Sequence, residues 1–173
     1  YGMQPHDVIY NMMQYSDIVF GDQNEWEVAS GVKHIPFNAL DAGYVINREA
    51  YQEYFRKMHV LFPKCKKMVM ALRNQLASSH HTLTGLLYDA VHDSLYTTKI
   101  YDIQPIVDPM GVGDAFVAGY IHAHQKWTAD NQYCLDFALS ASALKNTIPG
   151  DQNLVTEEEI ISNLTSSGGR IQR

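Results

Sequence analysis

The sequence has few cysteines, no excess of basic residues and no long apolar run. Its two cysteines, Cys65 and Cys134, stand far apart without a Cys-x-x-Cys pair. We therefore expect reduced, buried thiols in a cytoplasmic protein rather than a disulfide framework. The formal net charge of −6 argues against a binder of nucleic acids or acidic membranes. No stretch approaches a membrane span in length, and no signal-peptide pattern opens the chain.

The motif G-x-x-x-x-G-K-[ST] is also missing, which excludes a P-loop kinase on motif grounds. The 173 residues that are present, 46% hydrophobic and 18% charged, are typical of one soluble globular domain. The chain begins at Tyr1 rather than at a methionine, so we expect a fragment or a processed chain.

Helical and strand patterns alternate along the chain without an internal repeat or an interdomain linker. Helices are predicted over residues 5–16, 22–30, 47–62, 114–127, 131–146 and 156–164. Strands are predicted over 17–21, 67–72, 83–88 and 95–101, and loops over 32–46 and 73–82. Long connections between strands indicate the α/β class. We expect residues 1–164 to form the domain and the small, polar residues 165–173 to fray.

The stretch "IVDPMGVGDAFVAGY", residues 106–120, places two glycines at the start of a predicted helix. A helix N-terminus has unpaired backbone N–H groups and favours negative charge, and glycine lets a phosphate approach closely. Gly111-Val112-Gly113 therefore predicts a phosphate site. Asp114 would repel a phosphate, unless it faces a substrate hydroxyl and takes its proton during phosphoryl transfer. The alternative is that Asp114 only neutralises the helix dipole.

Three other polar features each allow two interpretations. Asn24 and Glu27 could support Mg²⁺ through water, or they could belong to a plain polar first turn, because Asp22 and Glu25 already make a near capping box. Arg73 could clamp a phosphate, or it could be a solvated loop residue. The histidine pairs at 80–81 and 122/124 do not share a face or suggest a third ligand, so no metal site is predicted from them.

The glycine stretch resembles the C-terminal signature of the ribokinase-like (PfkB) carbohydrate kinase family, commonly D-T-x-G-A-G-D-x-F. The matching residues are Asp108, Gly111, Gly113, Asp114 and Phe116, whereas Pro109 and Val112 depart from the pattern. "DIVFGDQNEWEVASGV" is similar to the family's strand and N-x-x-E helix start. "ALRNQLASSHHTLTGLLYD" and "ALKNTIPGDQNLVTEEEI" are similar to stretches of 2-keto-3-deoxygluconate kinases. The resemblance covers nearly the whole chain and implies part of a three-layer α/β/α fold.

The resemblance also implies roles for particular residues. Asp114 would be the catalytic base, and Gly111, Val112 and Gly113 would form the anion hole for the transferring phosphoryl group. Asp108 would hold the loop, with a monovalent cation nearby. The remaining roles are the adenine side for Asn146 and Gly150, and magnesium and phosphate for Asn24 and Glu27. Ala71 stands where the family often has a nucleotide-contacting threonine, near Arg73.

Family members are considerably longer, and their N-terminal part supplies the first strands, a small β lid and most sugar contacts. We therefore expect this chain to be the C-terminal nucleotide-binding portion of an ATP-dependent sugar kinase, and to be inactive or nearly so alone, or to associate with a second copy. The substrate expected from the resemblance is 2-keto-3-deoxygluconate. The alternatives are a kinase for another sugar, such as fructose or ribose, and a non-catalytic nucleotide-binding or assembly module derived from a kinase.

Overall fold

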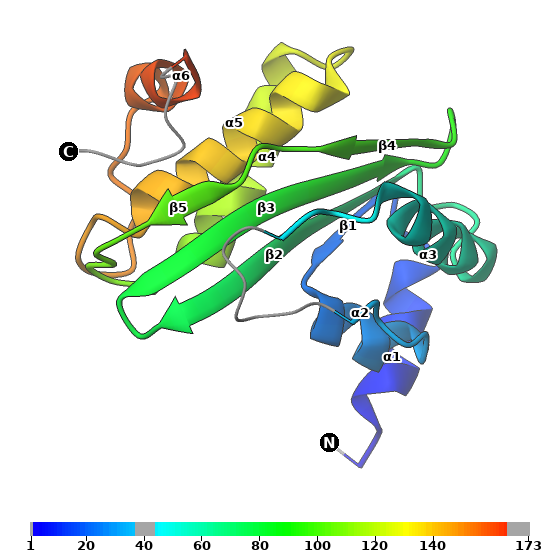
Figure 1. Cartoon of the computed structure of the whole chain (residues 1–173). Helices are drawn as coiled ribbons and strands as arrows, with labels where there is room; N and C mark the ends of the chain where they lie inside the picture. Colours follow the sequence, from blue (N-terminus) through cyan, green and yellow to red (C-terminus); the bar gives the residue numbers. More distant parts are fainter. Residues whose placement is uncertain (1, 37–43, 166–173) are drawn as a thin grey trace. The chain divides into compact units, whose positions relative to one another are not determined.

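The computed structural model describes residues 2–36 and 44–165 (Figure 1). Within them, six helices and five strands confirm the predicted α/β class. The helices are α1 (Pro5–Met13), α2 (Gln23–Ser30), α3 (Arg48–Leu61), α4 (Val112–Lys126), α5 (Asn131–Lys145) and α6 (Glu157–Thr165). The strands are β1 (Ile18–Gly21), β2 (Lys67–Ala77), β3 (His80–Asp89), β4 (Ser94–Thr97) and β5 (Tyr101–Ile103).

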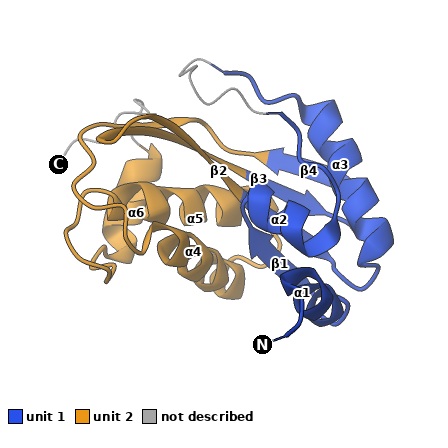
Figure 2. Ribbon diagram, turned by 90° about the horizontal axis from the view of Figure 1, so that it is seen from below, with its two compact units in different colours: residues 1–37, 44–70, 86–96 blue, residues 38–43, 71–85, 97–173 orange. Residues whose placement is uncertain are grey.

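The strands form one sheet in the order β1-β2-β3-β4, and β5 also pairs with β3. β1 runs parallel to β2 with Ile18 opposite Lys67, and β5 runs antiparallel to β3 with His81 opposite Ile103. The chain divides into two compact units, coloured in Figure 2. The described residues of unit 1 are 2–36, 44–70 and 86–96, and those of unit 2 are 71–85 and 97–165. The predicted frayed tail, 165–173, lies outside the described residues except for Thr165, which ends α6.

In unit 1, local sequence signals fix the ends of α2. The Asp22 side chain accepts the backbone N–H groups of Asn24 and Glu25, at 2.8 and 2.9 Å. The Glu25 carboxylate accepts the Asp22 N–H in return, at 2.8 Å, so the expected capping box is present. Gly31 ends the helix with a φ of 73°, in the left-handed region that glycine adopts readily. These signals place Asn24 and Glu27 on the first two turns of α2.

The core of unit 1 is aromatic. Phe55, fully buried on α3, stacks on Tyr88 with ring centroids 5.7 Å apart and meets Trp26 edge-on at 6.0 Å. Such pairs add roughly 0.5–1.5 kcal/mol beyond the burial of apolar area. They join α2, α3 and β3 within the unit. The buried residues of α3 recur at helical spacing after Asn47, which places them on one face.

Two predictions about the strands are wrong. Residues 73–82 were expected to form a loop, but β2 continues to Ala77 and β3 begins at His80. Arg73 is exposed and Asn74 is buried, so strand alternation continues through polar residues. The single strand expected over 95–101 is divided between β4 and β5. The reason is local: Thr98 exchanges hydrogen bonds with Gly85 and donates its hydroxyl to the Lys99 carbonyl at 2.7 Å.

In unit 2, α4 and α5 pack at close range. A Cβ on Gly119 would lie 3.0 Å from the Ala141 Cβ, so glycine permits this approach. α5 is buried along most of its length, as its apolar pattern predicts, and its Leu135 packs against Gly85 of β3. Ile121 of α4 is 47% exposed, because it lies off the buried stripe of that helix. This packing fixes the first turn of α4, where the glycine motif lies.

Candidate active site

The glycine motif forms the start of α4 without a side-chain cap. Gly111 is the N-cap residue, with a φ of 72°, whereas side chains of Asp22, Asn47 and Asp130 cap α2, α3 and α5. A Cβ on Gly111 would lie 2.2 Å from the backbone oxygen of Asp151, so the position requires glycine on two grounds. The first-turn N–H groups, which a helix leaves unpaired, are therefore available to an anion.

Asp114 is exposed in this first turn. Its carboxylate makes no hydrogen bond or ion pair with any residue in the described part of the chain. Gly113 is exposed, with no heavy atom within 4 Å of where its Cβ would be. The Val112 carbonyl accepts the Ser142 hydroxyl at 3.0 Å, so α5 holds the turn in place. The turn thus presents backbone donors and a solvent-facing carboxylate on one rigid element.

Asp108 joins the glycine turn to the segment that follows α5. One carboxylate oxygen accepts the Met110 N–H at 2.9 Å, and the other accepts the Gly150 N–H at 2.8 Å. These two backbone bonds, and then the positive charge of Lys145, lower the pKa of the Asp108 carboxyl. Asp108 is therefore an anionic clamp between two stretches about 40 residues apart in sequence.

The two residues predicted for the adenine side differ in exposure. Gly150 is exposed, with a φ of 79°. Asn146 is only 1% exposed, its side-chain amide donates to the Ser142 carbonyl at 2.9 Å, and its own carbonyl accepts the Val107 N–H at 2.8 Å. Asn146 is therefore the C-cap residue of α5, and its carbonyl anchors the segment that leads from Val107 to the glycine turn. A nucleotide role for either residue stays a prediction.

Arg73 does not lie in a loop after a strand end, as was expected, but within β2. Its side chain is exposed, whereas His81 on β3 is 4% exposed. Burial, and then the charges of Arg73 and His80, lower the pKa of His81, so Arg73 lies near this imidazole within unit 2. A phosphate contact by Arg73 stays a prediction.

Asn24 and Glu27, the residues predicted to support magnesium, lie on α2 in unit 1. Glu27 accepts Lys33 Nζ at 3.1 Å, and its second carboxylate oxygen lies 2.6 Å from His34 Nδ1 and accepts the His34 backbone N–H. These contacts, the His34 backbone bond first, lower the pKa of Glu27 to about 2. Across the described ranges, no group of three or more His, Cys, Asp or Glu side chains could hold a metal ion. The Glu27 carboxylate already accepts the Lys33 ammonium and the His34 backbone N–H, so among the described residues it is not part of a closed magnesium cage.

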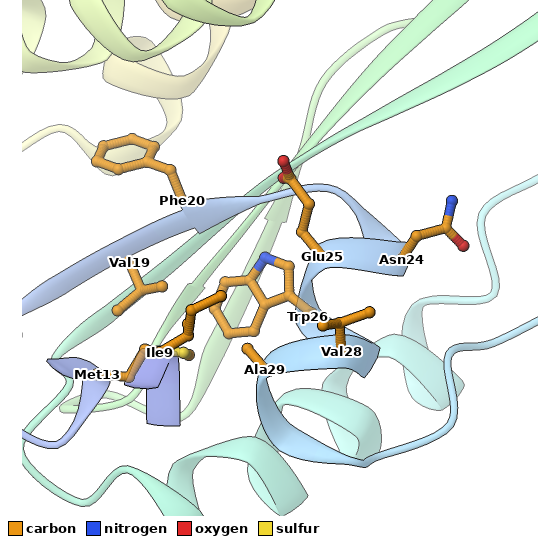
Figure 3. A pocket seen from close by; sticks show the side chains of 9 residues that line it. All are labelled: Ile9, Met13, Val19, Phe20, Asn24, Glu25, Trp26, Val28 and Ala29. Atoms are coloured by element: carbon orange, nitrogen blue, oxygen red, sulfur yellow. The ribbon is translucent and has the colours of Figure 1, made fainter. Parts of the chain in front are cut away.

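A hollow of about 450 Å³ lies in unit 1 between α1, β1 and α2 (Figure 3). Figure 3 shows the Trp26 indole among Ile9, Val19 and Ala29, with the Asn24 side chain directed away from it. The lining is mainly apolar, and of the predicted site residues only Asn24 reaches it. The carboxylate that lines the hollow, Glu25, is bonded to the Asp22 N–H of the capping box, unlike the solvent-facing Asp114 at the glycine turn.

Sequence reasoning missed two residues at this site. Lys145 is fully buried at the end of α5, a helix that is buried along most of its length. Asp151 packs its backbone against Gly111, and its distance along the chain hides the contact. A charged residue in an otherwise apolar helix was a usable signal for Lys145, but no local pattern marks Asp151.

The Asp108 clamp predicts a pH-dependent contribution to stability. Because its folded pKa is depressed, the carboxylate stabilises the fold above its ordinary pKa of 3.8, and this contribution is lost as the pH falls through the lower folded value. Asp108→Asn is expected to lower Tm at pH 7, since an amide cannot accept two N–H groups on separate oxygens. When Tm is measured from pH 7 to pH 2, the values for the unaltered chain and for Asp108→Asn should converge at the acid end. Asp7→Asn, an exposed control, should track the unaltered chain; a constant gap at all pH values would refute the clamp.

No protein-family model and no curated protein matches the chain. Solved structures do match, and several of them are carbohydrate kinases or proposed ones. A 2-dehydro-3-deoxygluconokinase from Thermotoga maritima superposes with a TM-score of 0.79 at 25% identity, over 93% of this chain and 45% of that one. The fold is that of the PfkB carbohydrate kinases. The resemblance predicted from the glycine signature is therefore confirmed.

Two further PfkB-type structures agree. A PfkB family carbohydrate kinase from Listeria grayi gives a TM-score of 0.76 at 22% identity, over 93% of this chain and 45% of that one. A proposed 2-keto-3-deoxygluconate kinase from Enterococcus faecalis gives a TM-score of 0.69 at 18% identity, over 99% of this chain and 50% of that one. The chain thus spans about half the length of the PfkB structures that it matches. No helix in residues 2–36 and 44–165 is long and apolar enough to cross a membrane.

Proposed function

We propose that this chain is the nucleotide-binding portion of an ATP-dependent sugar kinase of the PfkB type. The observation that carries the proposal is the uncapped first turn of α4, with Gly111 at its N-cap and an exposed Asp114 beside it. The substrate we propose is 2-keto-3-deoxygluconate, phosphorylated at its terminal hydroxyl. Its support is the name of the Thermotoga maritima structure, together with the sequence stretches similar to that sub-family.

The proposed chemistry is in-line phosphoryl transfer. The backbone N–H groups of Gly111, Val112 and Gly113 hold the γ-phosphoryl oxygens, and each such donor is worth roughly 10²–10³ in rate. The sugar hydroxyl oxygen forms a bond to the γ-phosphorus while the bond from phosphorus to the ADP oxygen breaks. The hydroxyl proton goes to the Asp114 carboxylate, which has no competing partner among the described residues.

The other predicted residues have supporting roles in this proposal. Asp108 fixes the glycine turn against Gly150, and Asn146 anchors the chain that enters the turn. Mg²⁺ that accompanies ATP supplies neutralisation of phosphate charge. Asn24 and Glu27 stay candidates for supporting it through water. The chain's own residues position the phosphoryl group and accept the proton.

Residue-resolved NMR of the chain tests the proposal. Titration with a non-hydrolysable ATP analogue and Mg²⁺ should shift the amide resonances of residues 111–114 saturably. Residues of the apolar hollow, such as Val19 and Ala29, serve as the internal control and should stay in place. Saturable shifts confined to other residues would contradict the assignment of the glycine turn as the phosphate site.

A further inference from the structure

Lys145, the last residue of α5, is fully buried. An ammonium group is costly to bury unless polar groups or opposite charges surround it. Its Nζ donates to the Ile148 carbonyl at 3.1 Å. Within residues 2–36 and 44–165 it forms no ion pair with a carboxylate. Burial of its alkyl stem explains part of this position, but the buried ammonium also bonds the Ile148 carbonyl of the segment that follows the helix.

The surroundings of Lys145 are the loops that shape the glycine turn. The next residue, Asn146, accepts the backbone N–H groups of Val107 and Asp108, at 2.8 and 3.3 Å. The charge of Lys145 also reaches the Asp108 carboxylate and helps to lower the pKa of that group. Lys145 therefore lies where α5, residues 107–111 and residues 146–150 are tied together.

The monovalent cation expected from the family resemblance would need oxygen ligands at this place. Both Asp108 oxygens already accept backbone N–H groups, and the Asn146 carbonyl accepts two more. The Ile148 carbonyl is taken by Lys145 itself. Hard cations require several oxygen ligands at once. Each Asp108 oxygen keeps a lone pair beside the N–H group that it accepts, so a shortage of acceptors does not by itself exclude a metal ion. The buried Lys145 ammonium, bonded to the Ile148 carbonyl, is what disfavours a second cation here, because two like charges repel strongly where water is excluded.

We infer that the Lys145 ammonium is a built-in cation that positions the glycine turn in place of a monovalent metal ion. It bonds the Ile148 carbonyl just beyond α5, and through residues 146–150 it is tied to the Asp108 carboxylate, which accepts the Gly150 N–H. Lys145 acts through the loops and is a positioning residue. The inference rests on the proposed function only in identifying the turn as the nucleotide site. The role of the Lys145 charge in holding the turn is tested on the chain without nucleotide.

Chemical rescue tests the inference. Tm is measured for the chain and for Lys145→Ala and Lys145→Met, in K⁺, NH₄⁺, Na⁺ and tetramethylammonium chlorides at equal ionic strength. The unaltered chain should have the same Tm in all four. Lys145→Ala should lose about 5 °C or more in tetramethylammonium and recover part of the loss in NH₄⁺ or K⁺, which fit the vacated space. The Tm of Lys145→Met should be lowered equally in all four salts, because the methionine side chain fills the space that a small cation would enter.

Lys57→Ala is the matched control, since this lysine is exposed on α3 and should show no salt-specific shift. Selective stabilisation of the unaltered chain by K⁺ would reveal a separate cation site and overturn the inference. So would a Tm of Lys145→Ala that is equal in all salts. If Lys145→Ala is unfolded in every salt while Lys145→Met unfolds like the unaltered chain, the lysine supplies volume rather than charge, which also overturns it.

Failure of the proposed function gives a different result. In that case the unaltered chain does not bind ATP, while the salt dependence of Tm in the variants stands by itself. If the proposed function and the role of Lys145 both hold, the ATP affinity of the unaltered chain is equal in K⁺ and in tetramethylammonium. The affinity of Lys145→Ala is then weakened in tetramethylammonium and recovers in NH₄⁺.

Discussion

Gly111→Ala is expected to abolish ATP binding by this chain and to lower its stability. The left-handed φ of 72° costs an alanine about 1–2 kcal/mol. The new Cβ would also lie 2.2 Å from the Asp151 backbone oxygen, so the turn must move to relieve the overlap. Moving the turn takes the first-turn N–H groups of α4 out of the arrangement proposed to hold the phosphoryl group. Tm and ATP affinity, measured on the same preparation, should both fall.

Gly113→Ala is the matched control, because it separates the fold from the site. Gly113 has open space around the position of its Cβ, and alanine is favoured over glycine in a helix by roughly 0.5–1 kcal/mol. Tm should therefore be unchanged or slightly higher. ATP affinity should still fall by about tenfold or more, since a methyl group stands where the phosphate approaches. ATP binding that is unchanged in Gly113→Ala would show that the phosphate does not reach the turn.

Asp114→Asn is expected to remove phosphoryl transfer while leaving ATP binding intact or tighter. As a general base, Asp114 contributes about 10²–10⁴-fold to the rate, so kcat should fall by that factor. Because the carboxylate repels a bound phosphate, its neutralisation should not weaken ATP. The measurements are the ATP dissociation constant on this chain, and ADP release with 2-keto-3-deoxygluconate in a preparation that turns over.

The alternative role for Asp114, neutralising the helix dipole, predicts a different effect of Asp114→Asn on stability and on kcat. If the carboxylate only neutralises the helix dipole, Asp114→Asn lowers stability by about 0.3–1 kcal/mol and leaves kcat unchanged. Asp130→Asn at the N-cap of α5 provides a comparison, since that carboxylate accepts a backbone N–H at 2.8 Å. Activity that survives Asp114→Asn would show that the base has been assigned to the wrong residue.

Features coded by neighbouring residues could be predicted from the sequence. The capping box of Asp22 and Glu25, the Gly31 end of α2 and the glycine start of α4 each depend on residues within one helical turn. The glycine signature carried the PfkB resemblance in the same way. Local steric and hydrogen-bond rules decide these features, so distant packing has little influence on them.

Features that depend on distant partners could not be predicted. The polar stretch after Leu72 was read as a loop, because pairing between strands rather than residue type keeps Arg73 and Asn74 extended. Asp108 was assigned to the loop, but its second partner is Gly150, 42 residues on. For Glu27 the sequence left open a magnesium role and a plain polar turn, and it did not indicate that the carboxylate would contact Lys33 and His34 of the following loop. In each case the sequence allows several contacts for the same side chain, and the packing of the folded chain decides which of them forms.

Calorimetric titration of the chain with ATP, with and without Mg²⁺, tests the central claim most directly. The proposal predicts saturable binding that is abolished in Gly111→Ala and weakened in Gly113→Ala, although the latter keeps its Tm. Absence of saturable binding in a chain that unfolds cooperatively would contradict the claim that its residues bind the nucleotide. Equal affinity in the unaltered chain and Gly113→Ala would contradict the placement of the phosphates at the glycine turn.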